Sequence, residues 1–360
     1  MPAVPPAGDV GKDLVCHINI AAGYRGGERQ TELLVKDLAK RGWRQRLIVR
    51  RGSPLAGRCR RVDGLDVTEV VGQPGAAWIA ARGSSLVHAH EARSIYAGWL
   101  LQMSSGVPYL FTRRVDNPLK RSRLRDLAYR RADRIVTLSC AIATIIKESY
   151  PDLECKIVPD AHSDLAATLD ADSDIRAQYA GRTVIGHIGA LDNKHKGQRS
   201  IIRAAALASR SDPELLFVLV GDGRDGEELR RAALGLDNVV FTGRVDDVGA
   251  YLAAFDVFLY PSLHEGLGSS LLDAMCFGLP IIASRVGGIP EIVEHEVNGL
   301  LIAPEDPEGI VSAIEIIRSC PQTRRAMRRA NLEKSALYGA DRMASAYEAI
   351  YRSILVQHPG

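Results

Sequence analysis

The chain has 360 residues, of which 46% are hydrophobic and 25% charged, and its formal net charge is +3 at pH 7. This composition excludes a disordered chain, and the length is sufficient for two domains with separate hydrophobic cores. The six cysteines are scattered without a C-x2-C pair, so the sequence indicates neither a zinc site nor a disulfide framework.

The start of the chain bears on its compartment. Residues 1–12 are rich in Pro, Ala and Gly and lack the basic start and apolar core of a signal peptide. No apolar run approaches the length needed to span a membrane. We therefore expect a cytoplasmic protein.

Charge is distributed unevenly. Residues 1–165 contain 26 Lys and Arg against 17 Asp and Glu, whereas the remainder contains 20 against 26. Basic residues are dense from Arg113 to Arg134, much of it a helical stretch. They indicate a surface for anionic lipid or a phosphorylated acceptor; the alternative is a solvated helix face with i,i+4 ion pairs. Little aromatic interleaving argues against nucleic acid. The residues assigned to an acceptor or membrane surface are Arg113, Arg114, Lys120, Arg121 and Arg123.

Strand-like and helical runs alternate in the first half. The order is typical of a parallel α/β sheet. The predicted strands are 14–20, 46–49, 85–89, 109–112 and 134–138, and the predicted helices are 28–41 and 94–103.

A second series of the same kind follows. Its predicted strands are 183–188, 215–220, 239–241, 257–260, 281–284 and 300–302, and its helices are 198–209, 227–234 and 269–277. Two Rossmann-like domains fit this pattern better than one large sheet. Pro159 and an Asp/Ala/Ser-rich stretch interrupt it, so we place the boundary between 157 and 179, with a hinge around 158–162 that has a structural role.

The segment from Tyr260 to Met275 carries the most chemistry. A buried strand is stopped by Pro261, and a turn at 266–268 precedes a predicted helix. Free amides at such a helix start attract a diphosphate. Glu265 can accept hydrogen bonds from sugar hydroxyls, and Asp273, about two turns into the helix, from ribose hydroxyls. The segment therefore predicts a nucleotide-sugar site.

These residues also resemble a family. The pattern Glu265-x7-Asp273, followed by Gly278-Leu-Pro and Gly287-Gly-Ile-Pro-Glu291, is similar to the retaining group 1 (family 4) glycosyltransferases, whose motif is Glu-x7-Glu. The resemblance implies the GT-B fold, in which two Rossmann-like domains face each other across a cleft. Residues 1–165 would bind the acceptor, 166–340 the nucleotide sugar, and the helix in 341–360 would pack back on the first domain.

The resemblance also implies roles for single residues. Lys196, in the stretch from Gly189 to Gly197, would neutralise the donor diphosphate; the family's arginine in that stretch is Ala190 here, with Lys194, His195 or arginines of the first domain as substitutes. His90 resembles the family histidine near the donor sugar and acceptor. Because His88 and His90 share one side of a regular strand, His90 reaches a cleft only if the strand ends before it.

Two glycine-rich turns complete the site. Gly26 and Gly27 follow the first strand, and the run from Gly221 to Gly226 spells G-x-G-x-x-G, which is also an NAD fingerprint but lacks the acid that should close the next strand. By resemblance, Arg244 lies near the base. The implied catalytic residues are Glu265, Lys196 and His90. The implied donor-binding residues are Gly26, Gly27, Gly221, Arg244, Gly266, Leu267, Gly268, Ser269, Ser270 and Asp273.

The function implied is retaining transfer of a hexose-type sugar from a UDP or GDP sugar to an acceptor hydroxyl, in lipopolysaccharide or other cell-surface glycan assembly. We expect no metal or other cofactor, because no Asp-x-Asp closes a strand, and a peripheral contact with the inner face of an anionic membrane. Two alternatives remain: a nucleotide-sugar epimerase of the same fold, and a catalytically weak nucleotide-sugar-binding subunit, which Ala190 and Asp273 suggest.

Overall fold

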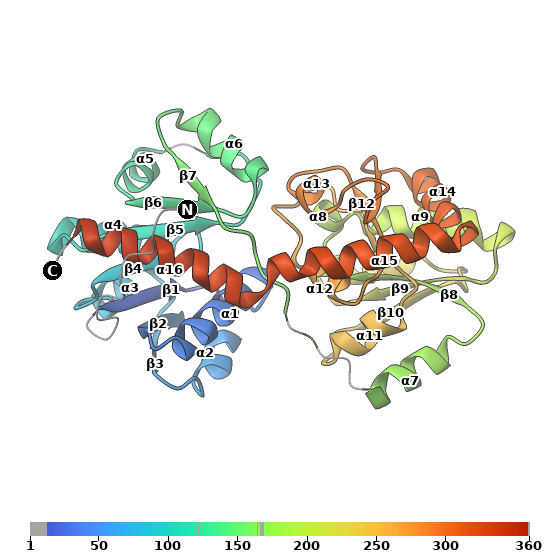
Figure 1. Ribbon diagram of the computed structural model, residues 1–360, viewed down its shortest axis with the longest axis horizontal. Helices are drawn as coiled ribbons and strands as arrows, with labels where there is room; N and C mark the ends of the chain where they lie inside the picture. Colours follow the sequence, from blue (N-terminus) through green and yellow to red (C-terminus); the bar gives the residue numbers. More distant parts are fainter. Residues whose placement is uncertain (1–12, 121, 164, 166–168, 359–360) are drawn as a thin grey trace. The chain divides into compact units, whose positions relative to one another are not determined.

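The computed structural model describes residues 13–120, 122–163, 165 and 169–358. The chain divides into two compact units, one formed by Met1–Ala161 with Ala340–Gly360 and the other by His162–Gly339. Each unit contains one parallel sheet with helices packed on it (Figure 1). None of the helices in the described part of the chain is both long and apolar enough to cross a bilayer.

The N-terminal unit contains a seven-stranded sheet in the order β3-β2-β1-β4-β5-β6-β7. Its strands are β1 (Leu14–Asn19), β2 (Arg44–Arg50), β3 (Leu65–Val70), β4 (Leu86–Ala89), β5 (Tyr109–Arg113), β6 (Arg134–Thr137) and β7 (Cys155–Ile157). Its helices are α1 (Gly26–Lys40), α2 (Pro54–Cys59), α3 (Pro74–Ala80), α4 (Ser94–Ser105), α5 (Arg123–Arg130), α6 (Cys140–Ser149) and α16 (Ala340–Gln357).

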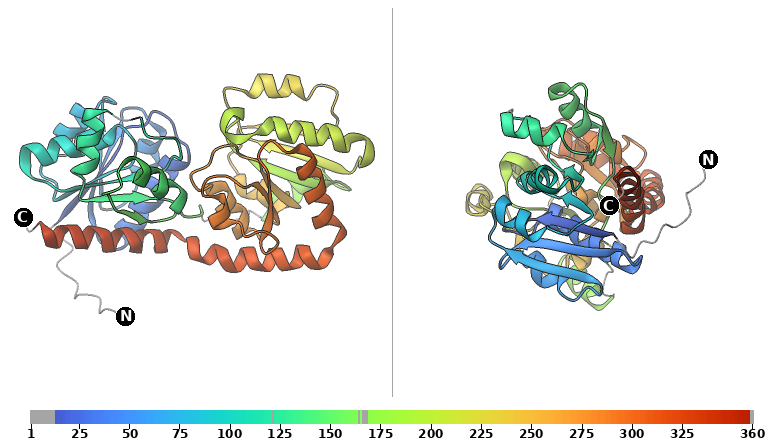
Figure 2. Two further views of the ribbon diagram at one scale, coloured as in Figure 1. Left: turned by 90° about the horizontal axis from the view of Figure 1, so that it is seen from above. Right: turned by 90° about the vertical axis from the view of Figure 1, so that its left-hand side faces the viewer.

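The last helix, α16, belongs to this unit and runs along it, as Figure 1 and the left view of Figure 2 show. Its buried Tyr347 and Tyr351 join a core with side chains of α1 and of the central strands. Arg41, which follows α1, donates to the carbonyl of Asp341 at 2.6 Å and to the carboxylate of Glu348 at 3.1 Å. The alternating side chains of the strands place His17 and His88 on this same face.

The second unit contains a six-stranded sheet in the order β10-β9-β8-β11-β12-β13. Its strands are β8 (Thr183–Ile188), β9 (Leu215–Val220), β10 (Val239–Gly243), β11 (Val257–Tyr260), β12 (Ile281–Ser284) and β13 (Gly299–Ile302). Its helices are α7 (Leu169–Gln178), α8 (Asn193–Lys196), α9 (Gln198–Ser211), α10 (Gly226–Ala232), α11 (Val248–Ala254), α12 (Ser269–Cys276), α13 (Ile289–Ile292), α14 (Pro307–Ser319) and α15 (Pro321–Ser335), with the 3-10 turn η1 (Ala336–Tyr338).

Both sheets reverse their strand order beside their first strand. In the N-terminal unit β1 lies between β2 and β4, and in the second unit β8 lies between β9 and β11. The loops after the two central strands diverge there, which leaves a crevice at the carboxyl edge where α/β sheets bind ligands. The loops after β8 and β11 hold Lys196 and Glu265, respectively.

The two Rossmann-like sheets that we predicted are present, but five elements of the N-terminal unit were missed: α2, β3, α3, α6 and β7. β3 and β7 are the edge strands and carry many part-exposed side chains, so they lack a continuous apolar run. The chain passes from one unit to the other after residues 161 and 339, whereas we placed these boundaries after residues 165 and 340. His162 already belongs to the second unit, where its amide donates to the carbonyl of Tyr338 at 2.9 Å.

Gly186, in the middle of β8, is expected to tolerate no side chain. A Cβ there would lie 2.0 Å from the ring of Phe255, which is buried. We expect Gly186→Ala to lower the free energy of unfolding by about 3 kcal/mol, because a packed ring cannot move aside. Denaturant unfolding would measure this change. The control is Gly57→Ala in α2, where a Cβ meets nothing within 4 Å; an equal loss in both variants would contradict the steric explanation.

Candidate active site

Three polar side chains converge at the carboxyl edge between β8 and β11. The Lys196 Nζ atom donates to Glu265 Oε2 at 2.5 Å and to the Tyr260 hydroxyl at 2.6 Å. The Tyr260 hydroxyl in turn donates to Glu265 Oε2 at 2.6 Å. Thus the two predicted catalytic residues of this unit, distant in sequence, lie in direct contact.

Backbone contacts between the two loops place these side chains. The amides of Leu263 and His264 donate to the carbonyl of His195 at 2.8 and 3.2 Å. Gly197, next to Lys196, has φ 65°, and a Cβ there would lie 2.1 Å from the carbonyl oxygen of Pro261. Only glycine permits this approach, so Gly197 fixes α8 against the loop that carries Glu265.

The charge state of this cluster follows from its contacts. Burial alone would lower the pKa of Lys196, but Tyr260 and Glu265 beside it outweigh burial, and its pKa is raised. Burial, and then Glu265, raise the pKa of the Tyr260 hydroxyl. Lys196 is therefore a cation and Tyr260 neutral at physiological pH. A half-buried lysine of this kind can take up the negative charge of a diphosphate.

The glycine turns beside this cluster are sites of close backbone approach. A Cβ on Gly221, whose φ is 133°, would lie 2.1 Å from the carbonyl oxygen of Gly189, and Gly223 approaches Leu191 similarly. The run from Gly221 to Gly226 thus packs against the loop that contains Ala190. This contact accounts for two of its glycines without a dinucleotide.

The turn before α12 is built from buried residues around a glycine with positive φ. Gly268 precedes the helix with φ 103°, and Gly266 and Leu267 are buried beside it. Ser269 and Ser270 form the first turn and are half-buried. Backbone amides at the start of a helix are donors of the kind that bind anions.

Asp273 and Arg244 differ in their surroundings. Asp273 is buried, and its carboxylate accepts from the Ser163 amide at 2.7 Å and from the Ser163 hydroxyl at 3.2 Å. Sequence analysis did not foresee this partner. Arg244 is exposed just beyond β10 and, within the described ranges, forms no ion pair.

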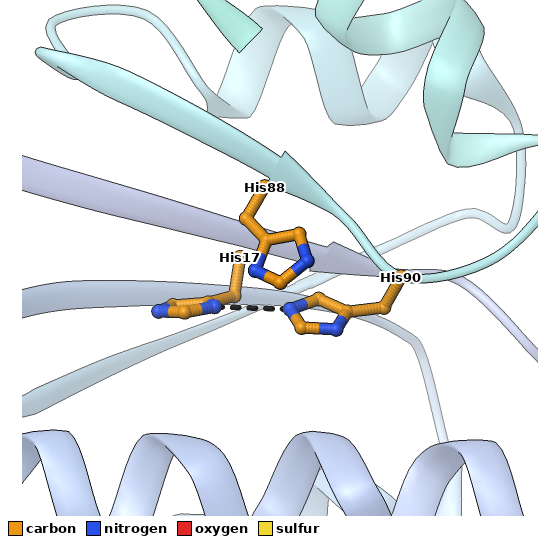
Figure 3. A group of neighbouring side chains, drawn as sticks. All are labelled: His17, His88 and His90. Atoms are coloured by element: carbon orange, nitrogen blue, oxygen red, sulfur yellow. Dashed lines mark hydrogen bonds between the residues drawn. The ribbon is translucent and has the colours of Figure 1, made fainter. Parts of the chain in front are cut away.

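His90 lies in the N-terminal unit, just after β4 ends at Ala89. Its amide still donates to the Ile18 carbonyl at 3.0 Å, so the ladder continues one residue past the strand. The His90 ring therefore stays on the side of His88, with ring centroids 3.7 Å apart, and its Nε2 is hydrogen-bonded to His17 Nδ1 at 3.0 Å (Figure 3). Only 2% of His90 is exposed.

The three rings of His17, His88 and His90 form a buried cluster whose ring nitrogens lie within 4.8 Å of one another. Such donors suit a transition metal. However, both nitrogens of His88 are already hydrogen-bonded, to the Tyr351 hydroxyl at 2.6 Å and to Thr112 Oγ1 at 2.8 Å. Burial, with a further effect of Arg114, lowers the pKa values of His88 and His90. A cation would meet the same opposition, so this arrangement favours three neutral rings.

A pocket of about 550 Å³ opens at the carboxyl edge of the N-terminal sheet. It is lined from the start of α1, the turn after β4, the end of β5, the loop at 115–120, and α5. Of the predicted residues it collects Gly27, His90, Arg113, Arg114 and Lys120.

Other predicted residues of this unit lie elsewhere or have their own partners. Gly26 and Arg123 do not line the pocket, and Arg121 lies outside the described residues. Arg114 forms an ion pair with Asp160 and passes over Gly27, where a Cβ would lie 3.4 Å from its Cδ.

Sequence analysis missed two residues that complete these sites. Tyr260 was assigned only to a strand, although its position at the carboxyl end of that strand indicates a place in the site. Asp160 was assigned to the hinge, and its ion pair with Arg114 joins segments that no local pattern connects.

Two Rossmann-like units, each built on one parallel sheet, define a GT-B fold. Residues 25–159 match the glycosyl transferase 4-like domain, and residues 182–319 match the family described as glycosyl transferases group 1. The chain belongs to the group 1 glycosyltransferases, which use nucleotide sugars.

Relatives and solved structures agree with this assignment. The chain is 31% identical over 297 residues to 2-deoxystreptamine N-acetyl-D-glucosaminyltransferase of Streptomyces fradiae, a match that covers 73% of this chain and 70% of the relative. It is 28% identical to D-inositol 3-phosphate glycosyltransferase of Saccharomonospora viridis, over 84% of this chain and 76% of the relative. In fold it is similar to Anabaena HepE, solved with UDP and glucose, with TM-score 0.84 and 20% identity over 94% of this chain and 99% of that one.

Proposed function

We propose that the protein is a retaining hexosyltransferase that moves a sugar from a UDP or GDP donor to an acceptor hydroxyl without a metal ion. The observation that carries the proposal is the contact of Lys196 with Glu265 at the carboxyl edge between β8 and β11. HepE, which has the same fold, was solved with UDP and glucose, and this supports a nucleotide-sugar donor.

The roles follow from the charges and contacts. Lys196 and the first amides of α12 stabilise the departing diphosphate. They provide the positive charge that a metal ion would otherwise provide. Glu265 orients the sugar hydroxyls. Its Oε2 accepts hydrogen bonds from both Lys196 and Tyr260, which makes that oxygen a poor nucleophile, so we propose positioning and electrostatics rather than a covalent intermediate. Asp273 holds the ribose by exchanging its bonds to Ser163 for ribose hydroxyls.

For the acceptor, we propose a glycan of the cell surface, such as a lipopolysaccharide core, met at the inner face of the membrane. The support is the basic stretch that includes α5, where Leu124 and Leu127 are exposed beside arginines. Sedimentation with anionic and neutral vesicles tests this proposal. Equal binding to both kinds of vesicle, or to neither, would contradict the membrane contact.

Calorimetry with UDP and GDP, with and without magnesium, tests the donor site. We expect one nucleotide to bind equally well with and without magnesium. If the folded protein binds neither nucleotide, the donor site is not functional. The coupling constant of the anomeric proton in the product then distinguishes retention from inversion.

A donor-binding subunit with little turnover is the second candidate, and the bond between Asp273 and Ser163 favours it. Such a subunit would bind UDP or GDP without transfer. Because Ala190 replaces a cation of the family motif, Ala190→Arg should then raise donor hydrolysis or transfer. An unchanged rate would remove this candidate.

A further inference from the structure

The pocket of the N-terminal unit has an excess of positive charge. Five basic side chains line it: Arg25, Arg113, Arg114, Lys120 and Arg125. Arg114 is paired with Asp160. Over the described ranges of the chain, the other four basic side chains form no ion pair.

The two carboxylates in the pocket are outnumbered by the five cations, and each of them is hydrogen-bonded at a helix start. Glu28 accepts from the backbone amide of Arg25 at 2.8 Å, at the start of α1. Glu91 accepts from the Arg93 amide and from the Ser94 hydroxyl, each at 2.9 Å, at the start of α4. Both carboxylates therefore serve helix starts.

The remaining wall is apolar and aromatic. Ile95, Phe111, Leu119 and Tyr129 line it, and the rings of Phe111 and Tyr129 lie 4.6 Å apart. Arg113 lies across this wall and donates to the Tyr129 hydroxyl at 3.4 Å and to the Asn117 carbonyl. Cations above an apolar floor suit a molecule that presents an anionic group and a ring or chain face together.

We infer that this pocket binds the acceptor through a phosphate group that the acceptor carries, with Arg113 and Lys120 as its cationic contacts. The inference rests on the proposed transfer reaction and adds the chemical class of the acceptor. A neutral acceptor would leave these like charges unneutralised around a partly desolvated pocket. A phosphate removes that repulsion, and its oxygens match the planar fork of an arginine.

The test uses sn-glycerol 3-phosphate as the probe and glycerol as its neutral counterpart, with calorimetry on the full chain. The probe is measured in wild type, Arg113→Gln, Lys120→Gln and the double variant. Arg131→Gln is the matched control, because Arg131 is exposed, forms no ion pair in the described chain, and lies outside the pocket. We expect glycerol 3-phosphate to bind more tightly than glycerol, and each pocket variant to weaken it by about tenfold.

Phosphate binding in the pocket has to be distinguished from binding at Lys196, which also attracts anions. Glycerol 3-phosphate should still bind to Lys196→Ala, whereas loss of binding there with normal binding in the double variant would overturn the inference. Equal binding of glycerol and glycerol 3-phosphate, or equal weakening by Arg131→Gln, would also overturn it. UDP binding is measured on the same proteins. Its absence would contradict the proposed donor site while the pocket result stands by itself.

The source of the phosphate is decided with vesicles. If a lipid headgroup is the acceptor, binding to phosphatidylglycerol vesicles should fall in the double variant and be competed by glycerol 3-phosphate. If the acceptor is a soluble phosphate ester, only the calorimetric signal should fall. Either result supports the phosphate contact, and no change in either assay would refute it.

Discussion

Lys196→Ala is expected to lower the turnover number for sugar transfer by about 10²- to 10³-fold, the effect of removing one preorganised charge partner from a developing anion. Lys196 is the cation that the structure places on Glu265 and Tyr260, and its raised pKa keeps it protonated throughout the neutral range. Ala190 leaves the neighbouring cation position of the family motif empty, so Lys196 has no arginine there to share the charge. Steady-state kinetics with the donor identified by calorimetry would measure this loss.

Two controls separate charge from folding. Arg203→Ala removes an exposed basic side chain of α9 that forms no ion pair in the described part of the chain, and it should leave turnover within about twofold of wild type, because an exposed cation without a fixed partner contributes little. Lys196→Ala also leaves Glu265 without its cation, so thermal unfolding has to show that the variant is folded. An equal loss of turnover in both variants, or none in Lys196→Ala, would refute the assigned role.

Sequence alone predicted the second sheet more fully than the first, although six helices of the second unit were missed: α7, α8, α11, α13, α14 and α15. The strands at 183–188, 215–220, 257–260 and 281–284 have the bounds that we predicted. The last three are mainly apolar and buried along their whole length, and the first is buried in its middle. The edge strands β3 and β7 escaped prediction because solvent replaces one neighbour and permits polar side chains. Apolar runs therefore identified the centres of both sheets better than their edges.

Positions in the candidate site could be predicted where a motif is local, and contacts could not be predicted where sheet order brings distant residues together. Glu265 and the turn before α12 could be assigned from adjacent residues. The contact of Lys196 with Tyr260 depends on β8 and β11 being neighbours, which no single segment encodes. His88 and His90 were expected on one side of the chain, but the proximity of the third ring, His17 on β1, follows only from the pairing of β1 with β4.

Acid is expected to destabilise the N-terminal unit through its three buried histidines. Burial lowers the pKa of His17 to about 3 and lowers those of His88 and His90 well below 6.5. In the unfolded chain all three return to about 6.5. Between these values the unfolded state binds more protons, so stability rises with pH across this window and falls as the pH is lowered from 7.

The loss of stability on acidification depends mainly on the histidine pKa in the unfolded chain, as long as the pKa in the folded protein lies well below the pH of the measurement. From pH 7 to pH 5 each such histidine removes about 2 kcal/mol of stability, and three remove about 6 kcal/mol. A domain of this size has about 5–15 kcal/mol in total. The contacts around the histidine cluster should be lost first, including the hydrogen bond between His88 and Tyr351 that helps to hold α16 on the sheet.

Denaturant unfolding at pH 7, 6 and 5 measures this dependence, and His17→Gln identifies its source. The glutamine keeps a polar side chain beside His90 but carries no titrating group, so the change between pH 7 and pH 5 should shrink by about 2 kcal/mol. A wild-type protein equally stable at pH 5 and pH 7 would show that the three rings already accept protons in the folded state. The packing around them would then have to open to water, and α16 would lose its anchor at Tyr351.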